Sequence, residues 1–248
     1  MASPIETLPD MGPRLVPRGR LLLVEDDPLL LPVYGRILRR AGYEVVHAYE
    51  ALVRSDTPGL AQPADLFAAA EQLGRVRELG RAIRALAARM AQQVARLFVN
   101  LHPLDLEDAD LFRPDAPLSR FGPRVVLEIT ERAPLDGLVG LAERNAELRA
   151  LGFRVALDDL GAGYSGLATF VNLKPDVVKL DMALTRHIDS EPRQRMLVET
   201  LVALCRELGI DVIAEGVETE AERDVLVTAG CDLLQGFLFG RPQRTLID

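Results

Sequence analysis

The sequence predicts an α/β fold, a modified (β/α)8 barrel of the TIM type whose first strand is atypical. Two observations predict it. Short apolar segments of strand length alternate with longer amphipathic segments along most of the 248-residue chain, which is the pattern of a parallel sheet covered by helices. Most of the apolar segments also end in an acidic, amide or lysine side chain, and the carboxyl ends of barrel strands form the edge at which active sites are built.

The N-terminal part of the chain differs from the rest. Residues 1–19 contain several prolines and no apolar periodicity, so we expect a disordered lead there. Residues 20–48 are predicted as strand, helix and strand, and Leu21–Val24 are followed by paired acids. This segment resembles the opening of a truncated response-regulator receiver domain, but no third strand with a phospho-accepting aspartate follows. We expect no phosphorylation signalling through it, and we expect residues 21–25 to join the barrel parallel to the neighbouring strand.

The barrel domain is expected over residues 43–248, overlapping the second strand of the preceding segment. Its first strand covers residues 43–52 and two helices follow Pro63. Residues 103–122 are expected to form a polar connection that contains prolines and at most a short helix. Further strands are expected at 97–100, 124–129, 153–158, 176–180, 211–214 and 232–236, and helices at 64–73, 76–95, 136–151, 165–171, 190–208 and 219–229.

Composition excludes several classes of protein. The formal net charge of −8 argues against binding to a nucleic acid polymer, which requires a basic face. Cys205 and Cys231 have neither CxxC nor zinc-ligand spacing, so we expect two small buried side chains. No apolar stretch is long enough to span a membrane and no signal-peptide core is present, which predicts a cytoplasmic protein.

The pair Asp158-Asp159 is the main chemical signal. It ends an apolar strand, precedes the loop Gly161-Ala162-Gly163, and has no adjacent arginine. A divalent cation would stabilise such a pair, because hard cations take oxygen ligands; the alternative is a polar loop with an aspartate that caps the next helix. Other expected strand ends also carry polar groups, which favours the cation site: Glu50, Asn100, Glu128 with Glu131 beyond it, Lys179, Asp181, Glu215 with Glu218, and Gln235.

Ordered motifs make the chemistry specific, because they resemble those of the EAL domain family and cover roughly residues 43–243. The resemblance implies a modified (β/α)8 barrel that hydrolyses cyclic di-GMP to linear pGpG with Mg²⁺ or Mn²⁺, at a site that holds two metal ions. The motifs are Glu50-Ala51-Leu52-Val53-Arg54, Asn100-Leu101, Glu128-Ile129-Thr130-Glu131, Asp158-Asp159-Leu160-Gly161, Lys179-Leu180-Asp181, Glu215-Gly216-Val217-Glu218 and Gln235-Gly236-Phe237.

The resemblance also implies residue roles. Lys179 resembles the lysine that orients the attacking water, Glu215 its base, and Glu131 a catalytic residue of the regulatory loop. Asp181 has the alternative of capping a turn, and His102 is expected at the rim of the site and not as a ligand. Metal ligands implied by the resemblance are Glu50, Asn100, Glu128, Asp158 and Asp159, and substrate contacts are Leu52, Arg54, Asp181 and Gln235.

One departure from the family pattern indicates an alternative to the enzymatic function. Family members begin with a strand bearing Gln-Pro-Ile, whose glutamine helps to hold the substrate, and this chain has no such segment. The alternative is therefore a catalytically impaired EAL module that binds cyclic di-GMP or a protein partner. A homodimer is left open.

Overall fold

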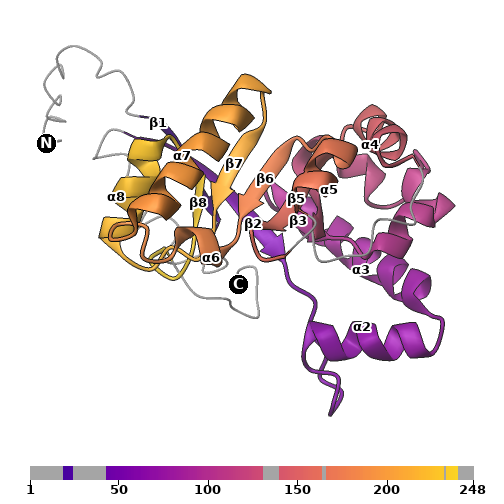
Figure 1. Cartoon of the computed structure of the whole chain (residues 1–248). Coiled ribbons are helices and arrows are strands. Elements are labelled where there is room, and N and C mark those ends of the chain that lie inside the picture. Colours follow the sequence, from indigo (N-terminus) through magenta and orange to yellow (C-terminus); the bar gives the residue numbers. More distant parts are fainter. Residues whose placement is uncertain (1–18, 25–42, 131–139, 164–165, 232, 240–248) are drawn as a thin grey trace, which may run out of the picture.

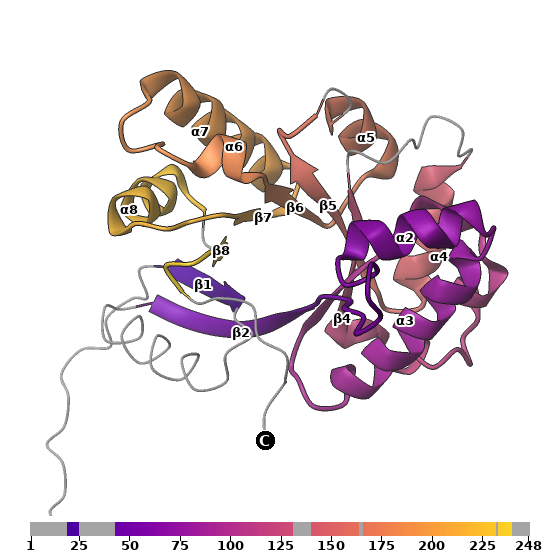
Figure 2. The same ribbon diagram turned by 90° about the horizontal axis from the view of Figure 1, so that it is seen from below.

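The computed structural model describes residues 19–24, 43–130, 140–163, 166–231 and 233–239. Within these residues, parallel strands are hydrogen-bonded in sequence order, and pairing of the first with the last closes a barrel (Figures 1 and 2). The α/β fold is therefore confirmed, and its barrel form is consistent with the TIM type. The strands are β1 Gly19–Val24, β2 Tyr43–Ala51, β3 Leu97–Asn100, β4 Val125–Thr130, β5 Arg154–Leu160, β6 Val177–Leu180, β7 Asp211–Ala214 and β8 Leu233–Gln235.

The first strand joins the barrel in the predicted direction. β1 pairs in parallel with β2 from Gly19 opposite Tyr43 to Val24 opposite Ala48. The other side of β1 pairs in parallel with β8. The expected helix between β1 and β2 lies outside the described residues. β1, the first strand of the receiver-like segment, is thus a barrel strand. The structure gives no support to a separate receiver domain.

Helices cover the strands from outside. In Figure 1, α7 and α8 lie on one side of the strands and α3 and α4 on the other. Two predictions need correction: residues 103–122 contain three 3-10 helices, and α6 was not expected at all. The helices are α2 Pro63–Gln72, α3 Val76–Ala91, η1 Pro103–Glu107, η2 Ala109–Phe112, η3 Ser119–Arg124, α4 Leu141–Ala150, α5 Gly166–Leu173, α6 Met182–Thr185, α7 Pro192–Glu207 and α8 Glu220–Ala229.

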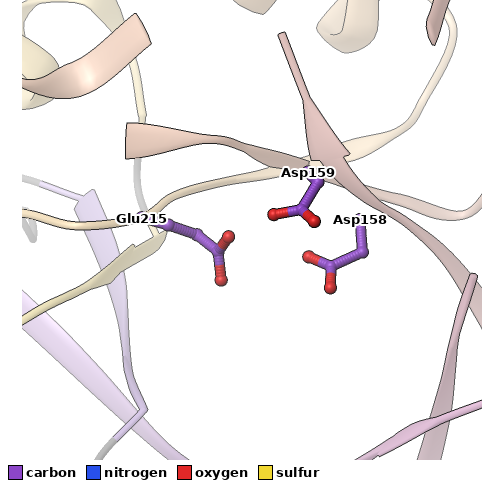
Figure 3. Close-up of side chains that lie close together, drawn as sticks. All are labelled: Asp158, Asp159 and Glu215. Carbon is purple, nitrogen blue, oxygen red and sulfur yellow. The ribbon is translucent and has the colours of Figure 1, made fainter. Parts of the chain in front are cut away.

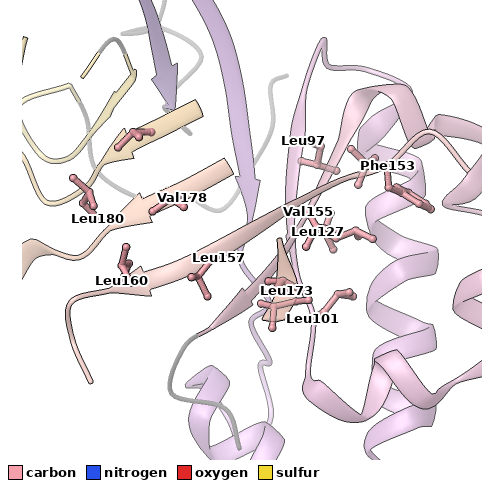
Figure 4. Close-up of a cluster of buried hydrophobic side chains, with 14 of the residues drawn as sticks. Leu97, Leu101, Leu127, Phe153, Val155, Leu157, Leu160, Leu173, Val178 and Leu180 are labelled. Atoms are coloured by element: carbon pink, nitrogen blue, oxygen red, sulfur yellow. The ribbon is translucent and has the colours of Figure 1, made fainter. Parts of the chain in front are cut away.

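Strand residues alternate between two apolar environments. One set, which includes Leu127, Val155 and Leu157, packs in the large cluster between strands and helices (Figure 4). The other set forms a smaller cluster with one residue from each of six successive strands, β2 to β7. Because contacts among six strands of a barrel can meet only at its axis, this second cluster fills the barrel interior.

The two cysteines are buried and unpaired with each other. Cys205 lies in α7, where burial raises the pKa of its thiol to about 11. Cys231 lies between α8 and β8. Among the described residues, no helix has the length and apolar character needed to cross a membrane.

A buried ion-pair network joins α3 to the 3-10 helices. Arg84 donates to Asp105 at 2.5 Å and to Asp108 at 2.7 Å, and these three side chains are almost fully buried. Arg81 adds a second bond to Asp108 at 2.7 Å. Gly80 makes room for the network, because a Cβ at this position would lie 2.0 Å from Asp105 Oδ1.

Replacement of Gly80 by alanine is expected to destabilise the protein although alanine is the better helix former. The added methyl group must displace the Asp105 carboxylate from its bond with Arg84, at a cost of about 1–3 kcal/mol. Urea unfolding followed by circular dichroism measures the free energy. Ala82→Gly, at an exposed position of the same helix, calibrates helix propensity; a more stable Gly80→Ala variant would contradict the prediction.

Candidate functional site

Seven of the predicted site residues form one layer of the barrel. Each lies two residues after a member of the interior apolar cluster, and side chains two apart on a strand share a face. The apolar layer therefore dictates that the polar layer above it also faces the barrel axis, at the carboxyl ends of the strands. The apolar layer consists of Ala48, Phe98, Val126, Ala156, Val177 and Ile213, with Leu233 packed against it; the polar layer consists of Glu50, Asn100, Glu128, Asp158, Lys179, Glu215 and Gln235.

Asp159 reaches the same place by a backbone irregularity. Regular alternation would direct it away from Asp158, but its φ is +61° and the pairing of β5 with β6 shifts between Leu157 and Leu160. Thr130 donates a hydrogen bond to Asp159 Oδ2 at 3.3 Å. As a result, carboxylate oxygens of Asp158, Asp159 and Glu215 lie within 4.8 Å of one another (Figure 3).

Lys179 is the central cation of the polar layer. Its side chain is 2% exposed, and Nζ lies 2.7 Å from Glu128, 2.8 Å from Glu215, 3.1 Å from Asp158 and 3.7 Å from Glu50. Four carboxylates thus surround one ammonium group. The cluster carries excess negative charge when all its members are ionised.

The pKa values follow from this imbalance. Burial alone would lower the pKa of Lys179, but the surrounding carboxylates raise it well above its ordinary value, so the ammonium stays charged. Burial raises the pKa of Glu128 well above its ordinary range, against the attraction of Lys179. Burial also raises the pKa of Glu215 to about 7, with repulsion from Asp158 in the same direction. One ammonium group therefore does not neutralise the cluster.

Glu50 differs from the other glutamates. Burial acts to raise its pKa, but Lys179 and hydrogen bonds from Gln235 and Asn100 together lower it. The amide of Asn100 donates to Oε1 at 3.0 Å, and the amide of Gln235 donates to Oε2 at 3.0 Å. Glu50 is therefore held as a carboxylate between β3 and β8.

These residues fit a divalent cation. Glu128 Oε2 is buried and accepts no hydrogen bond from the described part of the chain. A buried carboxylate oxygen without a donor is costly. Carboxylate and amide oxygens are the ligands that Mg²⁺ and Mn²⁺ prefer, and the excess of carboxylates supplies the charge.

Other predicted residues lie outside this cluster. Leu52 and Arg54 follow the end of β2 and are exposed, and Arg54 donates to the carbonyl of Val53. Asp181 is buried and caps α6, accepting from the Ala183 amide at 2.8 Å. Glu131 lies outside the described residues. The roles of these four residues stay predictions.

Two neighbours of the site were missed. Thr130 binds Asp159, and Thr185 donates from its hydroxyl to the backbone carbonyl of Glu215. Thr130 is part of the motif Glu128-Ile129-Thr130-Glu131 and could have been predicted as a site residue. Nothing in the sequence indicates Thr185, because α6 is too short to give a periodic signal. His102 caps η1 through Nδ1 and bonds Glu71 through Nε2, as expected of a rim residue.

A divalent cation is expected to raise the melting temperature, because it would neutralise carboxylates that Lys179 leaves uncompensated. At about 100 times its Kd, Mn²⁺ should stabilise the fold by about 2.7 kcal/mol, and EDTA should reverse the effect. Thermal unfolding by circular dichroism measures the shift. Asp158→Asn combined with Asp159→Asn should remove it, whereas Glu220→Gln, on the exposed face of α8, should not. A shift that persists in the double variant would place cation binding elsewhere.

Comparison with known proteins assigns the family. The EAL domain model matches residues 36–242. The cyclic di-GMP phosphodiesterase PdeR of Escherichia coli is 32% identical over 232 residues, which cover 88% of this chain and 34% of PdeR. RocR of Pseudomonas aeruginosa, also a cyclic di-GMP phosphodiesterase, is 34% identical over 66% of this chain and 42% of its own length.

A solved structure agrees in fold. Klebsiella pneumoniae BlrP1, in complex with manganese and cyclic di-GMP, superposes with a TM-score of 0.66 at 36% identity, covering 78% of this chain and 51% of BlrP1. The chain thus spans about a third of PdeR and about half of BlrP1. Because the family model matches most of its length, this chain belongs to the EAL domain family.

Proposed function

We propose that the protein is a metal-dependent phosphodiesterase that hydrolyses cyclic di-GMP to linear pGpG. The observation that carries the proposal is the group of four carboxylates around the Lys179 ammonium at the carboxyl edge of the barrel. PdeR, RocR and the cyclic di-GMP complex of BlrP1 support the substrate.

Two cations, Mg²⁺ or Mn²⁺, are proposed as cofactors. When bound, they would lower the pKa of the attacking water and stabilise negative charge on the phosphate. Glu50, Asn100, Glu128 and Asp158 would hold the first cation, and Asp159 would serve the second. The manganese and calcium complexes of BlrP1 support a divalent ion.

Lys179 and Glu215 have separate roles in the proposed reaction. The Lys179 ammonium stays charged, and it orients the attacking water by donating a hydrogen bond to its oxygen. Glu215 accepts the proton of that water, because its carboxylate lies beside the ammonium group that orients the water. The ion pair between them, 2.8 Å long, holds both groups at the same place.

Substrate contacts are proposed at the rim of the barrel. Arg54, with an exposed guanidinium group, would pair with a phosphate, for which its planar fork is well shaped. Leu52 offers apolar surface to a base. Gln235 and Asp181 would add polar contacts, and Glu131 would act with the loop that follows β5.

Incubation of the purified protein with cyclic di-GMP and Mg²⁺ or Mn²⁺ is expected to yield linear pGpG, detected by chromatography. Glu50→Gln and Lys179→Gln should each lower kcat at least about 100-fold, because each removes a group that holds the cation or the water. Lys174→Gln is the matched control, since Lys174 is the other lysine of the chain and lies exposed after α5.

Two outcomes would contradict the proposal. Turnover that survives in either Glu50→Gln or Lys179→Gln would refute the assigned roles. Binding of cyclic di-GMP at micromolar Kd without turnover would favour the alternative, a catalytically impaired EAL module that binds this nucleotide or a protein partner. The absence of the family's Gln-Pro-Ile strand is the observation that favours this alternative.

A homodimer through α5 is a further proposal. Leu167 and Val171 are 67% and 66% exposed and lie one helical turn apart, so they form one apolar face. Leu167→Asp is expected to lower the dimer fraction, measured by size-exclusion chromatography with light scattering. An unchanged mass distribution would exclude this face.

The cellular setting and the N-terminal segment are also proposals. Cys205 and Cys231 form no disulfide with each other, which supports action in a reducing compartment, the cytoplasm. The likeness of residues 20–48 to the opening of a receiver domain is one of sequence, and no phosphorylation role is proposed for this segment.

A further inference from the structure

Helix α6 follows β6, which carries Lys179, and contacts Glu215, which follows β7. It begins one residue after β6, where the Asp181 amide donates to the Leu160 carbonyl at 3.0 Å. The Asp181 carboxylate then accepts from the Ala183 amide at 2.8 Å. The start of α6 is therefore capped by Asp181, and the Asp181 amide fixes it to the end of β5.

The end of α6 holds the backbone of Glu215. Thr185 is fully buried, at 0% exposure, and its hydroxyl donates to the Glu215 carbonyl. The Glu215 amide donates to the Leu180 carbonyl at 3.1 Å. Both backbone groups of Glu215 are thus held by the segment that follows Lys179, which fixes the direction in which the Glu215 side chain leaves the chain.

The loop after Glu215 is pressed against the same helix. Gly216 has a φ of +69°, and a Cβ there would lie 2.6 Å from Met182 Cβ. Two residues later, Glu218 forms an ion pair with Arg186. Met182 and Arg186, on either side of Thr185, therefore restrict the loop that begins at Glu215. The bond from the Thr185 hydroxyl sets the position of the Glu215 backbone within this loop.

We propose that Thr185 is a positioning residue that holds the Glu215 carboxylate beside Lys179 and within reach of Asp158 and Asp159. Loss of the hydroxyl leaves the partly buried Glu215 carbonyl without the donor that Thr185 supplies, so the loop shifts to find another. Even a small shift separates Glu215 from a partner that is 2.8 Å away. The effect on turnover rests on the proposed function; the position of Glu215 does not.

Manganese affinity, measured by electron paramagnetic resonance of free Mn²⁺, tests the proposal without turnover. Thr185→Val, which keeps the side-chain shape, is expected to weaken Mn²⁺ binding about tenfold, and Thr185→Ser should restore it to within about twofold. In a Glu215→Gln background the same Thr185→Val change should have no further effect. In the wild-type background, kcat for cyclic di-GMP should fall with Thr185→Val while KM stays within about twofold.

Thr200→Val is the control, because Thr200 makes the same type of bond, to the Met196 carbonyl at 2.8 Å, on an exposed face of α7. It should leave Mn²⁺ affinity unchanged. Unchanged Mn²⁺ affinity in Thr185→Val would overturn the proposal. An equal loss of affinity in the wild-type and Glu215→Gln backgrounds would also overturn it, and so would absence of Mn²⁺ binding in the wild type. Mn²⁺ binding without turnover would reject the proposed function alone, and the affinity comparison would still decide the role of Thr185.

Discussion

The buried ammonium of Lys179 is the charge on which the whole upper layer of the barrel depends. Carboxylates from β2, β4, β5 and the end of β7 lie within 4.0 Å of it. Without a cation at the centre, these acids would repel one another in a desolvated place. With only one, Glu128 and Glu215 have raised pKa values. Among the described residues, Lys179 compensates part of this negative charge, and the remaining charge suits a metal ion.

The apolar layer below the polar layer stabilises this arrangement of charges. Six buried side chains, one from each of β2 to β7, fix the strands relative to one another. The pleat then places the next inward-facing residue of every strand on the same level. A one-residue slip of β6 would direct Lys179 outward and bring an apolar neighbour in. The position of the charged groups is therefore set by packing that contains no charge.

The sequence allowed prediction of the regular part of this design. Apolar segments that end in polar residues predicted both the strands and the polar layer, because parallel strands end at one edge. The placement of Asp159 depends on a positive φ that alternation does not indicate. Helix α6 is a single turn, and the Arg84–Asp105–Asp108 network joins segments more than 20 residues apart, so neither leaves a local pattern. Geometry that depends on one backbone angle or one long-range contact escapes sequence periodicity.

The atypical first strand bears on the rim more than on the cation site. β1 lies between β8 and β2, and its last residue, Val24, pairs with Ala48, one layer below Glu50. Above that level, Gln235 of β8 reaches across to Glu50 of β2 with a hydrogen bond of 3.0 Å. Within the described residues, this bond joins β8 and β2 across the level of the polar layer. Under the proposed function, absence of the family's Gln-Pro-Ile segment removes a glutamine that the family resemblance assigns to substrate, whereas the Gln235–Glu50 bond of the polar layer is present. Its effect should therefore fall on KM before it falls on cation binding.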